Sequence, residues 1–247
     1  MKKHLVIVFL GLLSWSCARQ EPDAGILSPA VNALVQVAVY NIEVREPSGL
    51  AYNSKNNTLM TVSDGNSTVY EMDFTGRIIK SFAIQSSDLE GIALSANCDT
   101  MYVAEETNQL ITTYLINGTK LSSFPVNVAT VLSHGPEGVT VDKNKHVFVL
   151  NEKFPTMILE YNQGKEVWRK EINYTIDCSD IFYELPTDCF WIVSDESQRV
   201  VKLSRAGSLL GEWSIPVPKG EGLTIVQNKI YIVSDSENKL YVFQKPI

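Results

Sequence analysis

Short runs of β-branched and aromatic residues alternate with clusters of Asn, Asp, Ser and Gly along most of the chain. In the stretch 46–84 this alternation predicts four strands joined by three tight turns, which together form one antiparallel meander. The same pattern returns from Leu89, Pro136, Cys178 and Glu221. Five copies at a spacing of about 43 residues predict a repeat architecture.

Two sets of marker residues keep the copies in register. The first marker stands early in the first strand of each copy, at Gly49, Gly91, Gly138, Asp180 and Gly222. The second is a turn glycine between the third and fourth strands, at Gly76, Gly118, Gly164 and Gly207. The fifth copy ends before its fourth strand, whereas the stretch 33–42 before the first copy alternates like one. We therefore predict an all-β fold, a five-bladed β-propeller of four-stranded antiparallel blades whose ring is closed by the N-terminal strand.

The start of the chain has the pattern of a secretory signal. Two lysines precede an apolar run from Leu5 to Leu13, which is too short to cross a membrane, and small residues lead to Cys17. That cysteine stands at the acceptor position of a bacterial lipoprotein, although an ordinary signal peptide with an incidental cysteine is the alternative. We predict a signal peptide at 1–16, a lipidated N-terminus and tether at 17–32, and the propeller domain at 33–247.

Charge and cysteine content narrow the function. The formal net charge of −7 makes the chain a poor binder of nucleic acid and suits it to cations or to solubility. Besides Cys17 there are three cysteines, and the closest pair, Cys178 and Cys189, falls at opposite ends of a predicted hairpin, so we expect no disulfide. The chain has no CxxC or His-rich spacing, which disfavours zinc.

Two acidic series recur in phase with the predicted blades. The first stands before the marker, at Ser48, Glu90, Glu137, Ser179 and Glu221, and the second stands at the exit of the second strand, at Asp64, Glu105, Asn151, Asp195 and Asp235. Because neighbouring strands are antiparallel, both series are expected at one mouth of the central channel. Carboxylates gathered without Lys or Arg repel one another unless a cation relieves them, and oxygen-only ligands favour calcium. The alternative is that these side chains make only turn and inter-blade hydrogen bonds.

Two histidines remain after the signal. His134 precedes the Glu137 motif in a loop on the acidic face, where it could act as a general base or be a surface loop residue. No nucleophile pattern accompanies it, which favours the surface residue. His146 lies in a hairpin on the opposite face and is expected to be structural.

The repeated segments EPSGLAY, DLEGIAL, GPEGVTV and IVSDE resemble the SdiA-regulated family of bacterial propellers, distant relatives of NHL-repeat proteins. The resemblance covers residues 35–247 and implies a five-bladed propeller with a calcium site. The positions that correspond to the family motifs are Glu90, Glu137, Glu221, Asp195 and Asp235. Ser48, Ser179 and Asp180 depart from the motif, so the ring is uneven. The resemblance implies no established activity.

Two functions from different classes follow. The first is a lipid-anchored, calcium-binding propeller that acts as a binding or scaffold module at the cell envelope, on the outer membrane in a Gram-negative cell, with a glycan, peptide or envelope protein as ligand. The second is a calcium-dependent hydrolase, such as a lactonase or phosphoesterase, in which His134 or Asp195 would handle the proton. The lack of a nucleophile pattern favours the first.

Overall fold

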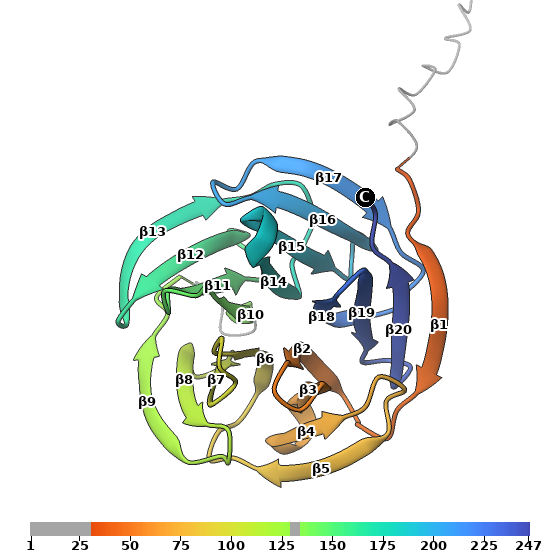
Figure 1. The fold of residues 1–247 in the computed structure, drawn as a ribbon. Helices are drawn as coiled ribbons and strands as arrows, with labels where there is room; N and C mark the ends of the chain where they lie inside the picture. Colours follow the sequence, from red (N-terminus) through yellow and green to blue (C-terminus); the bar gives the residue numbers. More distant parts are fainter. Residues whose placement is uncertain (1–30, 129–133) are drawn as a thin grey trace, which may run out of the picture. The chain divides into compact units, whose positions relative to one another are not determined.

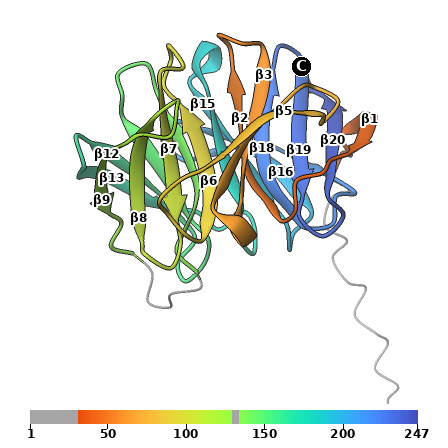
Figure 2. The same ribbon diagram turned by 90° about the horizontal axis from the view of Figure 1, so that it is seen from below.

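The computed structural model describes residues 31–128 and 134–247, and this part of the chain forms five four-stranded antiparallel sheets around a central channel (Figure 1). The first two blades are β2 (Pro47–Asn53), β3 (Thr58–Ser63), β4 (Thr68–Met72) and β5 (Ile78–Ala83), then β6 (Leu89–Leu94), β7 (Thr100–Glu105), β8 (Leu110–Leu115) and β9 (Lys120–Pro125). The next two are β10 (Pro136–Val141), β11 (Val147–Asn151), β12 (Met157–Asn162) and β13 (Lys165–Glu171), then β14 (Asp180–Glu184), β15 (Cys189–Ser194), β16 (Arg199–Ser204) and β17 (Leu209–Ser214). Two short 3-10 helices lie on opposite faces of the ring: η1 (Asp64–Asn66) connects β3 to β4, and η2 (Leu185–Thr187) connects β14 to β15. Figure 2 shows the ring edge-on.

The fifth blade joins the two ends of the described chain. Its strands are β18 (Gly220–Val226), β19 (Lys229–Ser234), β20 (Lys239–Gln244) and β1 (Val35–Asn41), in the spatial order β1-β20-β19-β18. Just before β1, the backbone N–H of Leu34 donates to the carbonyl of Ser214 at 3.0 Å, which ties the strand to the fourth blade as well. The prediction that the N-terminal strand closes the ring is confirmed.

The outer turns explain one set of glycine markers. Gly76, Gly118, Gly164 and Gly207 all have φ between 74° and 89°, a region that other residues enter only with strain. Each lies in the turn that connects the third and fourth strands of its blade. The predicted register of the repeats therefore agrees with the observed turns.

Four of the five first-set markers, which lie in the inner strands, are glycine because these strands converge at the channel. A Cβ atom on Gly91 would lie 2.4 Å from the carbonyl oxygen of Glu137 in the next blade, and one on Gly222 would lie 2.5 Å from the backbone of Gly49. Only glycine permits this approach of one backbone to another. The inner markers are thus required by the geometry of the ring.

Asp180 breaks the glycine series and fills the channel. Its side chain is 1 % exposed, and Oδ2 accepts the backbone N–H groups of Leu223 at 2.8 Å and Leu50 at 3.2 Å, which belong to β18 and β2. Oδ1 accepts the N–H of Ile181 at 2.8 Å. One carboxyl group therefore links three inner strands across the axis. Burial raises the pKa of Asp180 well above its usual value.

The hydrophobic core lies between neighbouring sheets. Each pair of adjacent blades encloses its own cluster of buried side chains, and the cluster between the fourth and fifth blades contains Trp191 and Phe243. Trp191 is 1 % exposed and stacks on Trp213, with ring centroids 5.3 Å apart. The hydrophobic stabilisation of the ring is therefore spread over the five blade-to-blade contacts.

The predicted signal peptide, Cys17 and most of the predicted tether lie outside the described residues. No helix in the described part of the chain is long and apolar enough to cross a membrane. The three cysteines of the propeller, Cys98, Cys178 and Cys189, are buried free thiols.

Candidate metal centre

Three inner-strand glutamates sit at β-bulges. In β6 the pairing with β7 skips from Leu89 to Gly91 and leaves Glu90 without a partner. The same skip leaves Glu137 unpaired in β10 and Glu221 unpaired in β18. A bulge bends its strand and re-aims the side chain of the extra residue. The glutamate before each marker glycine is therefore directed to one end of the channel.

The side chains of these glutamates line a cavity of about 260 Å³ at that end of the channel. Residues from all five blades line it: Glu46, Pro47, Ser48, Asp64, Glu90, Glu137, Glu152, Lys153, Asp177, Ser179, Asp195, Glu196, Lys219, Glu221 and Asp235. Ten of these residues are acidic and two are lysines, so the lining carries a large excess of negative charge. All five residues that the sequence placed in a metal site line this cavity.

The second acidic series was predicted one residue too early in two blades. Glu105, the last residue of β7, is 2 % exposed and accepts hydrogen bonds from Thr112 and Asn108 inside its own blade. Asn151, the last residue of β11, is fully buried and donates to the carbonyl of Pro155 at 2.8 Å. The interpretation that placed Glu105 and Asn151 at the mouth is therefore wrong.

The residue after each second strand takes that place instead. In chain order these residues are Asp64, Glu106, Glu152, Asp195 and Asp235, and all five are acidic. The strands themselves end at the buried residues Ser63, Glu105, Asn151, Ser194 and Ser234. Because side chains alternate along a strand, the buried end residue and the acidic residue after it point in different directions. The Ser-Asp pairs of three blades carried the signal that identifies Glu106 and Glu152.

Two groups of three carboxylates come close enough to share a cation. Oxygen atoms of Asp64, Asp88 and Glu90 lie within 4.8 Å of one another, and so do those of Glu106, Glu137 and Glu152. Asp88, Glu106 and Glu152 were not among the predicted ligands. Ser48 donates to Glu90 at 2.7 Å, so the serine that replaces glutamate in the first blade orients the glutamate of the second.

Burial and mutual repulsion hold protons on these carboxyl groups. Burial, with the charges of Asp64 and Glu106, raises the pKa of Glu90 to about 8 against the hydrogen bond from Ser48. Burial raises the pKa of Glu221 to about 7, and burial with the neighbouring Asp88 raises that of Asp64 to about 6. The raised pKa values indicate that the two lysines of the lining do not compensate the buried carboxylates.

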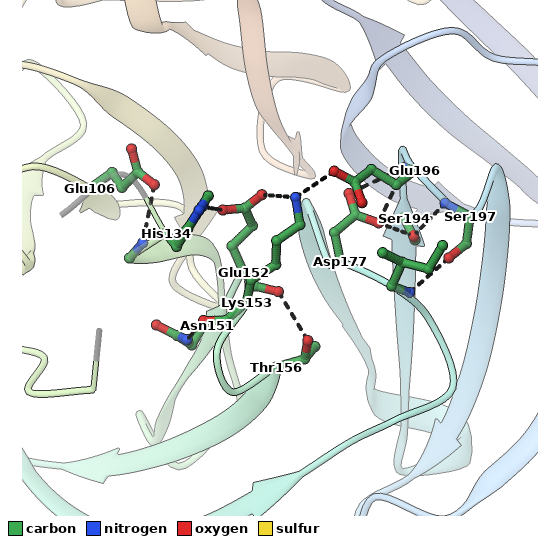
Figure 3. A network of polar contacts seen from close by, with 12 residues as sticks. Glu106, His134, Asn151, Glu152, Lys153, Thr156, Asp177, Ser194, Glu196 and Ser197 are labelled. Carbon is green, nitrogen blue, oxygen red and sulfur yellow. Dashed lines mark hydrogen bonds and ion pairs between the residues drawn. The ribbon is translucent and has the colours of Figure 1, made fainter. Parts of the chain in front are cut away.

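A chain of polar contacts runs along one side of the cavity (Figure 3). His134 contacts Glu152 through Nδ1 at 2.6 Å, and the other carboxylate oxygen of Glu152 pairs with Lys153 at 3.0 Å. Lys153 also pairs with Glu196 at 2.5 Å, which joins the third blade to the fourth. Lys153 is therefore already engaged by two carboxylates. His134 is on the acidic face, as predicted, whereas His146 contacts Glu160 in another part of the ring.

A five-bladed β-propeller with an acidic cavity at one end of its channel is the class of protein that this fold and this cavity define. The model of the SdiA-regulated family matches residues 26–244, and the chain belongs to that family. The resemblance of the repeated segments to this family is thereby confirmed. By sequence, no curated protein matches the chain.

Several solved propellers are similar in fold. A streptogramin B lyase has 16 % identity and a TM-score of 0.52, with 85 % of this chain and 73 % of that chain covered. The nidogen/laminin complex contains a chain with 14 % identity and a TM-score of 0.60, with 81 % and 76 % covered. A catalytically inactive virginiamycin B lyase from Staphylococcus aureus, solved with quinupristin, has 14 % identity and a TM-score of 0.52, with 81 % and 66 % covered. At these identities the similarity concerns the fold alone.

Proposed function

We propose that the protein is a calcium-binding propeller that acts as a binding or scaffold module at the cell envelope, held to the membrane by a lipid on Cys17. The observation that carries the proposal is the cavity at the end of the channel, where acidic residues from every blade converge and only two lysines oppose them. The N-terminal pattern and the absence of a nucleophile motif in the sequence support the location and the binding role.

Calcium is the cation that suits this donor set. The cavity is lined by carboxylate and hydroxyl oxygens, and no histidine or cysteine is among the lining residues that the structure describes. Hard oxygen donors in a loose arrangement match calcium, which accepts six to eight of them, better than they match zinc. Of the predicted ligands, Glu90 would bind calcium with Asp64 and Asp88, and Glu137 would bind it with Glu106 and Glu152. Glu221, Asp195 and Asp235 belong to neither group but line the same cavity, where they would add negative charge and outer ligands.

Calcium titration of the mature, chelator-treated protein tests the proposal. We expect isothermal titration calorimetry to give one saturable calcium isotherm, and Glu137→Gln to weaken it at least about tenfold because an amide oxygen carries no net charge for the cation. Glu171→Gln, an exposed substitution on β13, is the matched control and should leave the affinity unchanged. A protein that shows neither heat nor a change in melting temperature with millimolar calcium would rule the cation out.

The acidic face is also where we place the partner of the module. A glycan, a peptide or an envelope protein can supply hydroxyl or carboxylate oxygens to a cation at the mouth of the cavity, which would make its retention depend on calcium. The charge of the cavity disfavours nucleic acid as a partner.

One contact favours a calcium-dependent hydrolase as a second candidate. His134 is held at 2.6 Å from Glu152, which belongs to the group that also contains Glu106 and Glu137, so an imidazole stands beside the proposed cation site. A carboxylate can orient such an imidazole as a general base, while the cation supplies polarisation of a carbonyl or phosphoryl oxygen.

The hydrolase candidate predicts a specific pattern of loss. With calcium present, the protein should turn over at least one member of a panel of lactones and phosphoesters, and His134→Gln should lower that rate about a hundredfold or more while calcium affinity stays the same. Equal rates in the unsubstituted protein and in His134→Gln would show that the histidine takes no part in the turnover. Absence of turnover would reject the hydrolase and keep the binding module as the proposed function.

A further inference from the structure

A second cavity lies at the opposite end of the channel, on the face that carries η2. Its volume is about 340 Å³, near the lower end of the range for small-molecule sites, which begins at roughly 300 Å³. The inner strands of all five blades line it, and most of the lining is apolar, with Tyr52, Leu94, Val141, Phe182 and Leu185 among the residues. This composition differs sharply from that of the acidic cavity.

The two cavities are separate. They share no lining residue, and Ser179 faces the acidic cavity whereas Ile181 faces the apolar one. Between these two positions lies the buried carboxyl group of Asp180, bonded to the backbones of Leu50 and Leu223. A ligand of the apolar cavity therefore does not reach the proposed cation site.

The one charged side chain at the apolar cavity that lacks an ion-pair partner among the described residues is a lysine. Two charged residues line it, Asp142 and Lys143. Asp142 is buried and already satisfied, because it accepts the N–H groups of Asn144 at 2.8 Å and His146 at 2.9 Å and pairs with Arg205 at 3.4 Å. Lys143 is exposed and has no ion-pair partner among residues 31–128 and 134–247. An anionic group of a ligand at the rim would neutralise the charge of Lys143.

One buried hydroxyl beside the cavity also lacks a partner. Thr224 in β18 lines the cavity and is fully buried, yet its Oγ1 makes no hydrogen bond to any described residue. The equivalent residue of the third blade, Thr140, accepts the backbone N–H of Tyr183 at 3.0 Å. A buried polar atom without a partner is unfavourable by about 1–3 kcal/mol, so the Thr224 site calls for a polar group from outside the chain.

We propose that this cavity binds a small amphipathic carboxylate that carries a further hydroxyl or carbonyl oxygen in its apolar part. The carboxylate meets Lys143 at the rim, the apolar chain packs on the aliphatic and aromatic walls, and the inner oxygen exchanges a hydrogen bond with Thr224. The requirement for both polar groups distinguishes this ligand from a simple hydrocarbon and from an organic cation.

Three eight-carbon ligands test the proposal: 8-hydroxyoctanoate, octanoate and octylamine. Calorimetry on the mature protein is run with chelator, so that no carboxylate can coordinate calcium in the acidic cavity, and amide chemical shifts map the site. We expect 8-hydroxyoctanoate to bind most tightly, octanoate about fivefold more weakly because the inner hydrogen bond is lost, and octylamine not at all.

Two substitutions assign the contacts. Lys143→Glu should weaken both acids about fivefold or more, and Lys145→Glu, an exposed change in the same turn, is its matched control. Thr224→Val should abolish the preference for the hydroxylated acid, leave octanoate affinity unchanged and raise the melting temperature of the free protein, because an unpaired buried hydroxyl is removed. Binding of octylamine as tight as that of the acids, an unchanged preference in Thr224→Val, or chemical-shift changes confined to residues that do not line this cavity would each overturn the proposal.

Discussion

A chain that begins at Glu43, and therefore lacks β1, loses its cooperative thermal transition, whereas a chain that begins at Val31 keeps it. Without β1 the fifth blade has three strands, and β20 loses the partner with which it pairs from Val35–Gln244 to Asn41–Lys239. The buried side chains of Leu34 and Ile42 are removed as well. Several kcal/mol are lost together with the closure of the ring, so we expect the melting temperature to fall by more than about 15 °C if a transition survives.

Circular dichroism and size-exclusion chromatography measure this result. The shortened chain should elute as soluble aggregate or as an expanded monomer, because the free edge of β20 can pair with another chain. Adding the peptide 31–42 in trans should restore part of the transition in proportion to its concentration. If the chain that begins at Glu43 melts at the same temperature as the longer one, the fifth blade does not depend on β1.

Without calcium, the protein loses stability as the pH rises from about 5 to about 8, and calcium removes most of that loss. Glu90 and Glu221 have folded-state pKa values of about 8 and about 7, above the ordinary 4.5, mainly because they are buried. The folded state therefore binds more protons than the unfolded state between these values. The stabilisation is complete below the ordinary pKa and disappears as the pH rises through the folded-state pKa.

The size of the effect follows from the same shifts. After allowance for solvent screening, the two glutamates together account for roughly 3 kcal/mol, which corresponds to a fall of about 10 °C in melting temperature. A cation in the cavity neutralises the ionised carboxylates, so added calcium should raise the melting temperature more near pH 8 than near pH 5.

Thermal unfolding of the chelator-treated protein across this pH range, with and without millimolar calcium, measures both effects. Glu90→Gln removes one titrating group and should flatten the profile in chelator, whereas Glu171→Gln should leave it unchanged. A melting temperature in chelator that rises between pH 5 and pH 8 would contradict the assignment of raised pKa values to the cavity.

The sequence predicted the architecture of the ring well, because the architecture follows from backbone geometry that glycine records. The turn glycines mark positive φ, and the inner glycines mark places where backbones approach to contact distance. The missing fourth strand at the C-terminal end and the extra strand at the N-terminal end then left one way to close the ring. None of these signals depends on how side chains pack.

The cavity was predicted only in part, because the direction of a side chain depends on where its strand ends. A shift of one residue separates Glu105, which is buried in its blade, from Glu106, which joins Glu137 and Glu152. Asp88 was missed because it lies in a connecting segment, where no strand periodicity applies. Raised pKa values could not be read from the sequence either, since they arise from burial among residues of different blades.

Asp180 limits how far this propeller can be idealised. An engineer who averaged the five copies would write glycine at position 180, since the other four copies have it there. That change would leave the amides of Leu50, Leu223 and Ile181 without their shared acceptor. The asymmetry of this ring is thus a structural requirement, and a perfectly repetitive version would need some other group to occupy its axis.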